Sequence, residues 1–376
     1  MLTTIIVFFA ILLVLVIVHE WGHYIAAKKS GVHVEEFGFG LPPRIWGRKF
    51  GPEPKPGEED LRTLWSINLL PIGGFVRPRG EDSGVFDAND RKNLHNAPLL
   101  NRMIIVLAGP FMNLVLGILL FAIVYSIVGI PKNEGVFIKE VSPNTPAAEA
   151  GLAVGDKLVQ VAEKDVATVL QVRAYISENL GENVKVRYMR GDQQDEVALL
   201  ARENPPEGQG AFGVTLDQKV QRLTYDWYLM PFMGILQGFR DTYDLSSQIV
   251  PALGGMLRGI FIEREVPEGV GGPVQIAQAA RAFCVMFDGE RVVGIEPISC
   301  MQFAALISIN LAVFNLLPIP ALDGGRFAFY IVEAVTRRRV SPKVEQWAHS
   351  LGFALLILLM IIVTINDVMN PSELFK

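Results

Sequence analysis

The residues with the clearest chemical potential are His19-Glu20-Trp21-Gly22-His23, which directly follow an apolar run over residues 5–18. Side chains four positions apart lie on one face of a helix, so both imidazoles can bind one metal ion. The order His-Glu-x-x-His is a zinc-hydrolase signature, in which the glutamate acts on the metal-bound water. Ionisable groups are costly beside lipid, so such a cluster in a membrane segment indicates a functional site. The motif predicts a zinc centre in the membrane.

A second run, residues 315–326, can supply a third ligand, because catalytic zinc commonly has three protein ligands and a water. Two prolines before Asp323 prevent a regular helix, and the two glycines after it let the backbone turn. Alone, this Asp-Gly-Gly turn would indicate a helix terminator. Beside the first motif, it predicts that Asp323 is a ligand on a broken helix at the depth of His19 and His23.

Composition indicates a membrane protein with soluble parts. Hydrophobic residues make up 50% of the chain and charged residues 19%, below the roughly 25% of soluble domains, and the mean hydropathy is +0.32. A net charge of −5 argues against a general nucleic-acid binder. Four segments approach the roughly 20 residues that a transmembrane helix needs, although the third is short. They are residues 2–24, 103–130, 303–317 and 351–365.

The distribution of Lys and Arg predicts the orientation of these spans. Basic residues are frequent between the first two spans and between the last two, so both connections are expected in the cytoplasm. The N-terminus, residues 131–299 and the C-terminus would then lie outside. A helix rises 1.5 Å per residue, which places His19 and His23 about 25–33 Å from Leu2, near the cytoplasmic edge of the bilayer. The basic residues are Lys28, Lys29, Arg44, Arg48, Lys49, Arg91, Lys92 and Arg102, and then Arg326, Arg337, Arg338, Arg339 and Lys343.

Residues 131–218 have the pattern of a small inserted α+β domain. Strands are expected at 135–141, 157–161, 184–189, 196–200 and 212–216, and helices after Pro146 and at 172–179. The run Ser-Pro-x-x-Pro-Ala followed by Gly-Leu-x-x-Gly-Asp, residues 142–156, resembles a PDZ domain of the bacterial protease type. An unrelated small β-rich domain is the alternative. PDZ domains bind peptides by adding a strand to a sheet edge.

The loop between the first two spans contains an apolar, β-rich stretch, residues 64–76, interrupted by Pro71, Gly73 and Gly74. It cannot span a membrane as a helix. Non-helical backbone is tolerated at membrane depth only where protein or a wet cavity covers it. We expect a membrane-embedded hairpin beside the site, whose edge can hold an unwound substrate; a cytosolic pair of core strands is the alternative.

The two metal motifs, in this order and with a PDZ domain between them, resemble the site-2 protease family, and the bacterial regulator-of-sigma-E protease branch in particular. Gly109-Pro110-x-x-Asn113 and Gly271-Gly272-Pro273-Val274 are also similar to that branch. The resemblance implies a polytopic α-helical membrane protein with about four transmembrane helices and an inserted extracytoplasmic PDZ domain.

By the same resemblance, His19, His23 and Asp323 would bind Zn²⁺, Glu20 would be the catalytic acid/base, and Asn315 would position the unwound substrate. Family members with two PDZ domains are known, whereas one is found here, so the control of substrate entry is expected to be simpler.

The expected domains are residues 1–130 with the first two spans, 131–218 as the PDZ domain, 219–299 as a connecting segment, and 300–376 with the last two spans. Residues 228–261 are apolar but interrupted by Arg240, Asp241 and Asp244, which indicates an interfacial amphipathic segment rather than a fifth span. Cys284 and Cys300 flank a stretch, 283–299, for which the resemblance implies no role; they can form one disulfide or remain free thiols.

Together these features predict an intramembrane zinc metalloprotease of the inner (cytoplasmic) membrane. The sequence does not identify the substrate. The resemblance implies single-pass membrane proteins, either anti-sigma factors after a first cut outside or remnant signal peptides, and the PDZ domain would contact their ectodomain or new chain end. Two alternatives compete. A membrane-anchored protease of soluble segments would need a third ligand on a soluble helix, commonly Glu. A non-catalytic PDZ scaffold would be expected to lack a ligand or Glu20, and a metal assay separates it from the proteases.

Overall fold

The computed structural model describes residues 2–55, 57–80, 90–206, 209–258, 272–288 and 291–369. The chain divides into two compact units. A mainly helical unit comprises Met1–Val124 and Pro231–Lys376, and the segment Tyr125–Met230 forms the second unit between them. The second unit is somewhat larger than the 131–218 predicted for the inserted domain, because it includes the last residues of the preceding helix and its last strand extends to Leu223.

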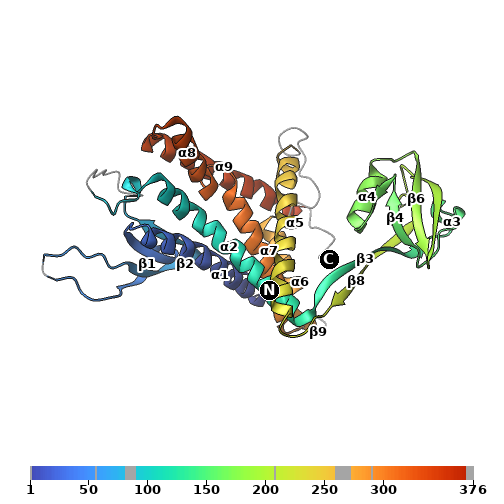
Figure 1. Cartoon of the computed structure of the whole chain (residues 1–376), viewed down its shortest axis with the longest axis horizontal. Coiled ribbons are helices and arrows are strands. Elements are labelled where there is room, and N and C mark those ends of the chain that lie inside the picture. Colours follow the sequence, from blue (N-terminus) through green and yellow to red (C-terminus); the bar gives the residue numbers. More distant parts are fainter. Residues whose placement is uncertain are drawn as a thin grey trace. The chain divides into compact units, whose positions relative to one another are not determined.

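Four helices of the first unit are long and apolar enough to cross a membrane, which confirms the four predicted segments (Figure 1). They are α1 (Leu2–Lys29), α2 (Leu99–Val128), α7 (Pro297–Leu316) and α9 (Pro342–Met369). Helix α7 is longer than expected. It begins at Pro297, since proline suits the first turn of a helix and the Glu296 side chain accepts a hydrogen bond from the Ile298 N–H at 3.2 Å.

Small residues let these helices approach closely. A Cβ on Gly22 of α1 would overlap the carbonyl oxygen of Ala108 on α2. Helix α5 (Met230–Arg258) packs on α2 in the same way, with Gly234 and Gly238 one turn apart against the α2 backbone. Small residues four apart are the usual means of close helix packing in membranes. Helix α5 covers most of the predicted amphipathic segment 228–261, and it is not one of the four candidate spans.

The end of the predicted connecting segment is a packed element rather than a linker. Helix α6 (Pro273–Cys284) contacts α1, α7 and α9, and the Asp367 carboxylate of α9 accepts the Gly272 N–H at 3.1 Å where α6 begins. Strands β9 (Val285–Asp288) and β10 (Arg291–Ile295) then form a hairpin. A disulfide joins Cys284 to Cys300, which resolves the choice between one disulfide and two free thiols.

The predicted hairpin within residues 64–76 is wrong in one respect. This stretch is a single long strand, β2 (Leu64–Pro78), that pairs with β1 (Val34–Lys49). Both strands bend, so that Phe37 lies opposite both Val76 and Trp65. Across the sheet, the paired segments lie side by side in the order 44–49, 64–68, 36–39 and 74–78. Residues 74–78 therefore form one edge of the sheet. Glycines and prolines within residues 38–43 interrupt the alternation typical of strands and obscured β1 in the sequence.

An aromatic cluster fixes this sheet to the last turns of α1. The Phe37 and Trp65 rings stack with centroids 4.8 Å apart, and Tyr24 of α1 lies 5.7 Å from Phe37, edge to face. Trp21 lies 5.9 Å from Trp65. The cluster therefore attaches β1 and β2 to the part of α1 that carries the His-Glu-x-x-His motif.

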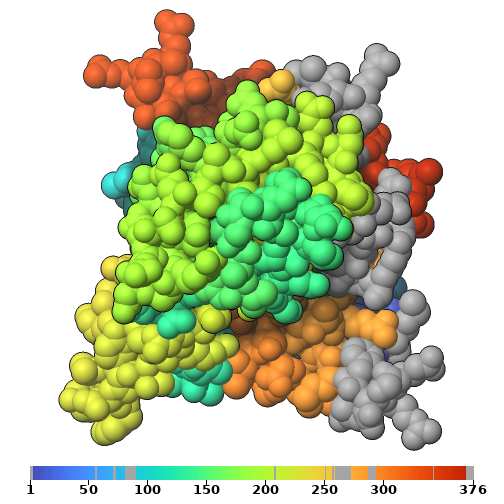
Figure 2. All heavy atoms as spheres, turned by 90° about the vertical axis from the view of Figure 1, so that its right-hand side faces the viewer, coloured from blue at the N-terminus to red at the C-terminus, as the bar shows by residue number. Residues whose placement is uncertain are grey.

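The second unit, which we call the PDZ-like unit, is a six-stranded antiparallel sheet in the order β7-β6-β4-β3-β8, with β5 paired to β4 (Figure 1). Thr145 caps α3 and Thr168 forms a capping box with Gln171 at the start of α4. Figure 2 shows one face of this unit, drawn in green. The elements are β3 (Ile130–Val141), α3 (Pro146–Glu149), β4 (Lys157–Val161), β5 (Lys164–Asp165), α4 (Val169–Ser177), β6 (Asn183–Arg190), β7 (Gln193–Leu200) and β8 (Val214–Leu223).

Asp156 fixes the turn before β4 in this unit. Its buried carboxylate accepts hydrogen bonds from Arg190 Nε at 2.8 Å and Nη2 at 2.7 Å, and from the Ala153 N–H at 2.8 Å. Burial by itself would raise the pKa of Asp156, but these donors and the charge of Arg190 lower it below its usual range. The Gly-Asp step of the sequence motif thus has a structural role here.

Asp156→Asn should lower the opening free energy of the PDZ-like unit by about 2 kcal/mol, because the Arg190 guanidinium loses its charged partner. Acid should have the same effect. A lowered folded-state pKa contributes stability that is present above the unfolded-state pKa and is lost as the pH falls through the folded-state value. Hydrogen exchange of the β4 and β6 amides measures both effects, with the exposed Asp192→Asn as the matched control.

Candidate active site

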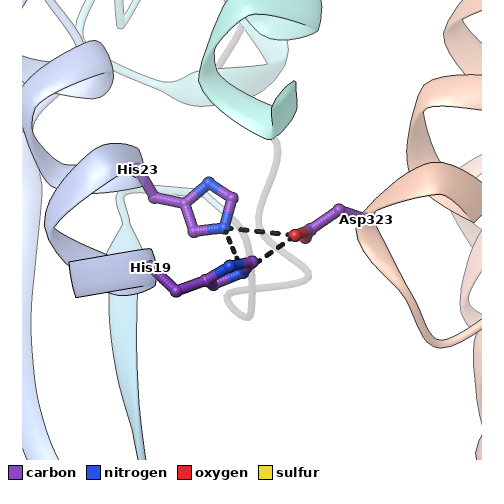
Figure 3. A group of neighbouring side chains, drawn as sticks. All are labelled: His19, His23 and Asp323. Carbon is purple, nitrogen blue, oxygen red and sulfur yellow. Dashed lines mark hydrogen bonds and ion pairs between the residues drawn. The ribbon is translucent and has the colours of Figure 1, made fainter. Parts of the chain in front are cut away.

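His19, His23 and Asp323 converge on one point, although Asp323 is at least 300 positions from either histidine in the sequence (Figure 3). Asp323 Oδ2 lies 3.0 Å from His19 Nε2 and 3.3 Å from His23 Nε2, and the two Nε2 atoms are 3.1 Å apart. Three ligands at zinc bond lengths in tetrahedral geometry would be about 3.3 Å apart. The spacing and the His₂Asp donor set therefore fit a zinc ion.

The turn between α7 and α8 delivers the Asp323 carboxylate to the histidines. Helix α8 (Asp323–Thr336) begins at this residue, so the carboxylate lies in its first turn. A Cβ on Gly324 would overlap the Leu317 carbonyl oxygen, and one on Gly325 the Ile319 carbonyl oxygen. The sequence suggested that these glycines free the backbone to turn, but both are helical. They are required because the first turn of α8 packs directly on the preceding chain.

Helix α2 orients both imidazoles. The Nδ1 atom of His23 lies 2.8 Å from the Ile105 carbonyl oxygen and donates to it, which leaves Nε2 free to bind a metal. The side-chain amide of the fully buried Asn113 lies 3.3 Å from His19 Nδ1. Asn113 Oδ1 makes no hydrogen bond within the described part of the chain. Rotation of the amide would let Oδ1 accept a hydrogen bond from the N–H at His19 Nδ1, which would leave the Nε2 of His19 free to bind a metal as well.

Gly109 gives the two imidazoles their space. A Cβ at this position would overlap His23 Nε2 and would lie 2.7 Å from His19 Nε2. The run Gly109-Pro110-x-x-Asn113 resembles the site-2 protease family, but its sequence alone indicates no role for it. The structure gives both ends of that run a function at the site, since one admits the histidines and the other contacts His19. The signal in the sequence was a glycine and an amide four residues apart inside an apolar helix.

A second contact anchors α8 to α2. Arg102 is buried, and its guanidinium donates two hydrogen bonds to Glu333, at 2.9 Å and 2.6 Å. The same guanidinium lies 5.0 Å from the Tyr330 ring centroid. Two parallel hydrogen bonds between guanidinium and carboxylate fix orientation as well as distance. This pair therefore helps to hold the helix whose first residue is Asp323.

The three converging side chains line a cavity of about 610 Å³. Glu20 and Asn315, the other two predicted site residues, also line it. Strand β2 contributes Phe75 and Val76, and a Cβ on Gly74 would lie 3.5 Å from Glu20 Cγ. His349 of α9 lies in the same wall and was not foreseen, because an isolated histidine at the start of an apolar segment carries no motif. All five predicted site residues thus surround one cavity.

Comparison with known proteins agrees with this geometry. The model of peptidase family M50 matches residues 7–359. A candidate zinc metalloprotease of Clostridium perfringens is 32% identical over 95% of this chain and 96% of its own length. The zinc metalloprotease RasP of Oceanobacillus iheyensis is 28% identical, over 98% of this chain and 99% of its own. The PDZ domain of the SdrC-like protein from Listeria monocytogenes is 26% identical and covers 23% of this chain and 90% of that domain, with a TM-score of 0.21.

The match extends through both metal motifs and the chain between them, and relatives that are matched over nearly their whole length carry zinc metalloprotease names. The chain therefore belongs to peptidase family M50, the site-2 proteases, and is a zinc metalloprotease.

Proposed function

We propose that this protease cleaves peptide bonds inside the transmembrane segments of single-pass membrane proteins, with His19, His23 and Asp323 as zinc ligands and Glu20 as the acid/base. The observation that carries the proposal is the meeting of three ligand atoms, no more than 3.3 Å apart, in the wall of a cavity that Glu20 also lines. When bound, zinc lowers the pKa of water and polarises the scissile carbonyl group.

Glu20 and Asn315 supply the remaining chemistry from opposite helices. Glu20 is next to the first histidine on α1, and its carboxylate takes the proton of the attacking water and returns it to the leaving nitrogen. Asn315 is in the last turn of α7, where its amide can hold a substrate carbonyl or N–H group. A substrate helix must unwind before attack, because its amides are otherwise engaged in intrahelical hydrogen bonds.

The edge of β2 is suited to hold an unwound substrate. Residues 74–78 form the outermost run of the β1–β2 sheet, and Phe75, Val76 and Pro78 line the cavity. An extended peptide can add to such an edge through main-chain hydrogen bonds. Several side chains of this sheet are apolar and exposed, among them Ile67 at 49% and Leu69 at 56%. This supports placing the sheet at membrane depth rather than in the cytosol.

The orientation proposed for the chain puts the site near the cytoplasmic edge of the bacterial inner membrane and the PDZ-like unit outside. The basic residues of the two connecting regions support it through the positive-inside rule. The Cys284–Cys300 disulfide is independent support, since disulfides persist in oxidising compartments. The proposed substrates are anti-sigma factors trimmed outside or remnant signal peptides.

Metal analysis of ligand variants tests the assignment of the site. The purified wild-type chain should contain about one zinc per molecule, and His23→Ala or Asp323→Ala should remove most of it. Glu20→Gln should retain zinc but lose cleavage by several orders of magnitude, because Glu20 moves protons and is not a ligand. Elemental analysis and cleavage of a co-expressed single-pass protein give the two readouts.

Two further variants make this test specific. Gly109→Ala should also lower the zinc content, because its methyl group would occupy the space of the imidazoles. Leu119→Ala, at an exposed position of the same helix, is the matched control and should retain zinc. Full zinc and activity in Asp323→Ala would show that another residue is the third ligand.

Reporter fusions test the orientation. A phosphatase fused after residue 200 should be active outside the cytoplasm, whereas fusions after residues 90 and 340 should be inactive. In intact cells, Cys284 and Cys300 should react with a maleimide only after reduction. An active fusion at residue 90 together with an inactive one at 200 would reverse the proposed orientation.

The PDZ-like unit should act as a gate that senses the outside part of a substrate, either by excluding bulky ectodomains or by binding a new chain end. Ile130 pairs with Leu223, so a short linker can replace residues 131–222. The deletion variant should keep its zinc and should cleave single-pass proteins whose ectodomains have not been trimmed. If it binds zinc and cleaves only trimmed substrates, as the wild type does, the gating role is wrong.

A further inference from the structure

We propose that His349 of α9 is a positioning residue for Asp323, which it fixes through the turn that precedes α8. The inference rests on the proposed role of Asp323 as a zinc ligand. It gives the last transmembrane helix a part in the metal centre, although that helix supplies none of the three converging ligand atoms.

The contact that carries the inference joins His349 to the backbone of the turn. The Ala321 N–H donates a hydrogen bond to His349 Nδ1 at 2.8 Å. Ala321 has a φ of +83°, in the left-handed region that residues other than glycine seldom adopt. Such a conformation persists where the surrounding structure enforces it. The hydrogen bond to His349 therefore stabilises Ala321 in this unfavourable backbone conformation.

A second contact, one turn further along α9, closes the helix on the same turn. A Cβ on Gly352 would overlap the Pro320 carbonyl oxygen and would lie 2.6 Å from the Pro320 Cβ. Glycine is therefore required for α9 to approach the turn as closely as it does. His349 and Gly352 contact two consecutive residues, Ala321 and Pro320, which precede the carboxylate by two and three positions.

The hydrogen bond also defines the state of the imidazole. Because Nδ1 accepts a hydrogen bond from the Ala321 N–H, it carries no proton itself, so the ring is neutral and its proton is on Nε2. His349 Nε2 is buried and has no hydrogen-bond partner within the described ranges, and the ring packs edge to face on Phe329 with centroids 5.8 Å apart. Nδ1 is therefore the atom through which His349 acts.

The path from His349 to the ligand is short. Leu322 caps α8, and its carbonyl oxygen accepts the Gly325 N–H at 3.1 Å, so the orientation of the first turn depends on the residue before Leu322. That residue is Ala321. A change in its backbone angles would rotate the Asp323 side chain away from the two Nε2 atoms, which it meets at 3.0 and 3.3 Å. Groups that orient a metal ligand commonly change metal affinity about 10- to 100-fold when they are lost.

Two amide variants, each of which mimics one ring nitrogen, distinguish the roles of Nδ1 and Nε2. In His349→Asn the amide oxygen can take the place of Nδ1, so the acceptor for Ala321 is kept. In His349→Gln the amide reaches towards the position of Nε2, and the acceptor at Nδ1 is lost. Gly352→Ala leaves the imidazole intact and pushes the turn away from α9, and Leu351→Ala, which is 62% exposed on the same helix, is the control.

The zinc affinity of the full-length chain, purified in detergent and titrated against a chelator, is the first readout. The visible spectrum of the cobalt-substituted protein is the second, because it reports ligand geometry directly. His349→Gln and Gly352→Ala should weaken zinc binding about tenfold or more and alter the cobalt spectrum. His349→Asn and Leu351→Ala should stay within about threefold of the wild type.

Wild-type affinity and an unchanged cobalt spectrum in His349→Gln would overturn the inference, and so would equal losses in His349→Asn and His349→Gln. Asp323→Ala, measured in parallel, separates this failure from failure of the proposed site. If that variant kept its zinc, the ligand assignment itself would be wrong. If Asp323→Ala lost its zinc while His349→Gln behaved as the wild type, only the positioning role of His349 would be wrong.

Discussion

Two imidazoles and a carboxylate, brought to within 3.3 Å of one another inside a group of apolar helices, impose the main constraint on this fold. Groups of this kind are costly to remove from water unless they are paired or bind a metal. For the three groups to meet, the helices that carry them must approach closely. Side chains at the contact points would prevent this approach or would fill the space that the imidazoles occupy. Glycine meets that need at several places, among them Gly22 between α1 and α2, Gly109 beside the imidazoles, and Gly324 at the start of α8.

The residues that meet at the site could be predicted from the sequence because the prediction depends on residue types at fixed spacing. His19, Glu20 and His23 are within one helical turn, and Asp323 follows prolines that break a helix. The contacts that orient these side chains come from residues far away in the sequence, so they could not be predicted from the local spacing of residue types. The Ile105 carbonyl oxygen holds His23, and any residue could provide it. His349 acts through a single backbone N–H, so no pattern around it distinguishes it from an ordinary buried histidine.

The fold was predictable to a similar degree. Apolar length identified the four candidate spans, and alternation identified most strands of the PDZ-like unit. The errors concern elements whose stability comes from distant partners. Strand β1 contains glycines and prolines that weaken its local signal, and it is held by pairing with β2 and by aromatic contacts with α1. Helix α6 is only 12 residues long, and its packing on three other helices could not be inferred from its own composition.

The paired ends of the PDZ-like unit have a consequence for how such proteases can diversify. Its first and last strands run together as a ribbon, with Ile130 opposite Leu223, immediately after α2 ends at Val128 and shortly before α5 begins at Met230. Chain that enters and leaves at adjacent points can be lengthened, duplicated or exchanged without altering the path of the helices on either side. The protease core can thus acquire new recognition modules by insertion at this junction, while selection on the residues that hold the metal remains unchanged.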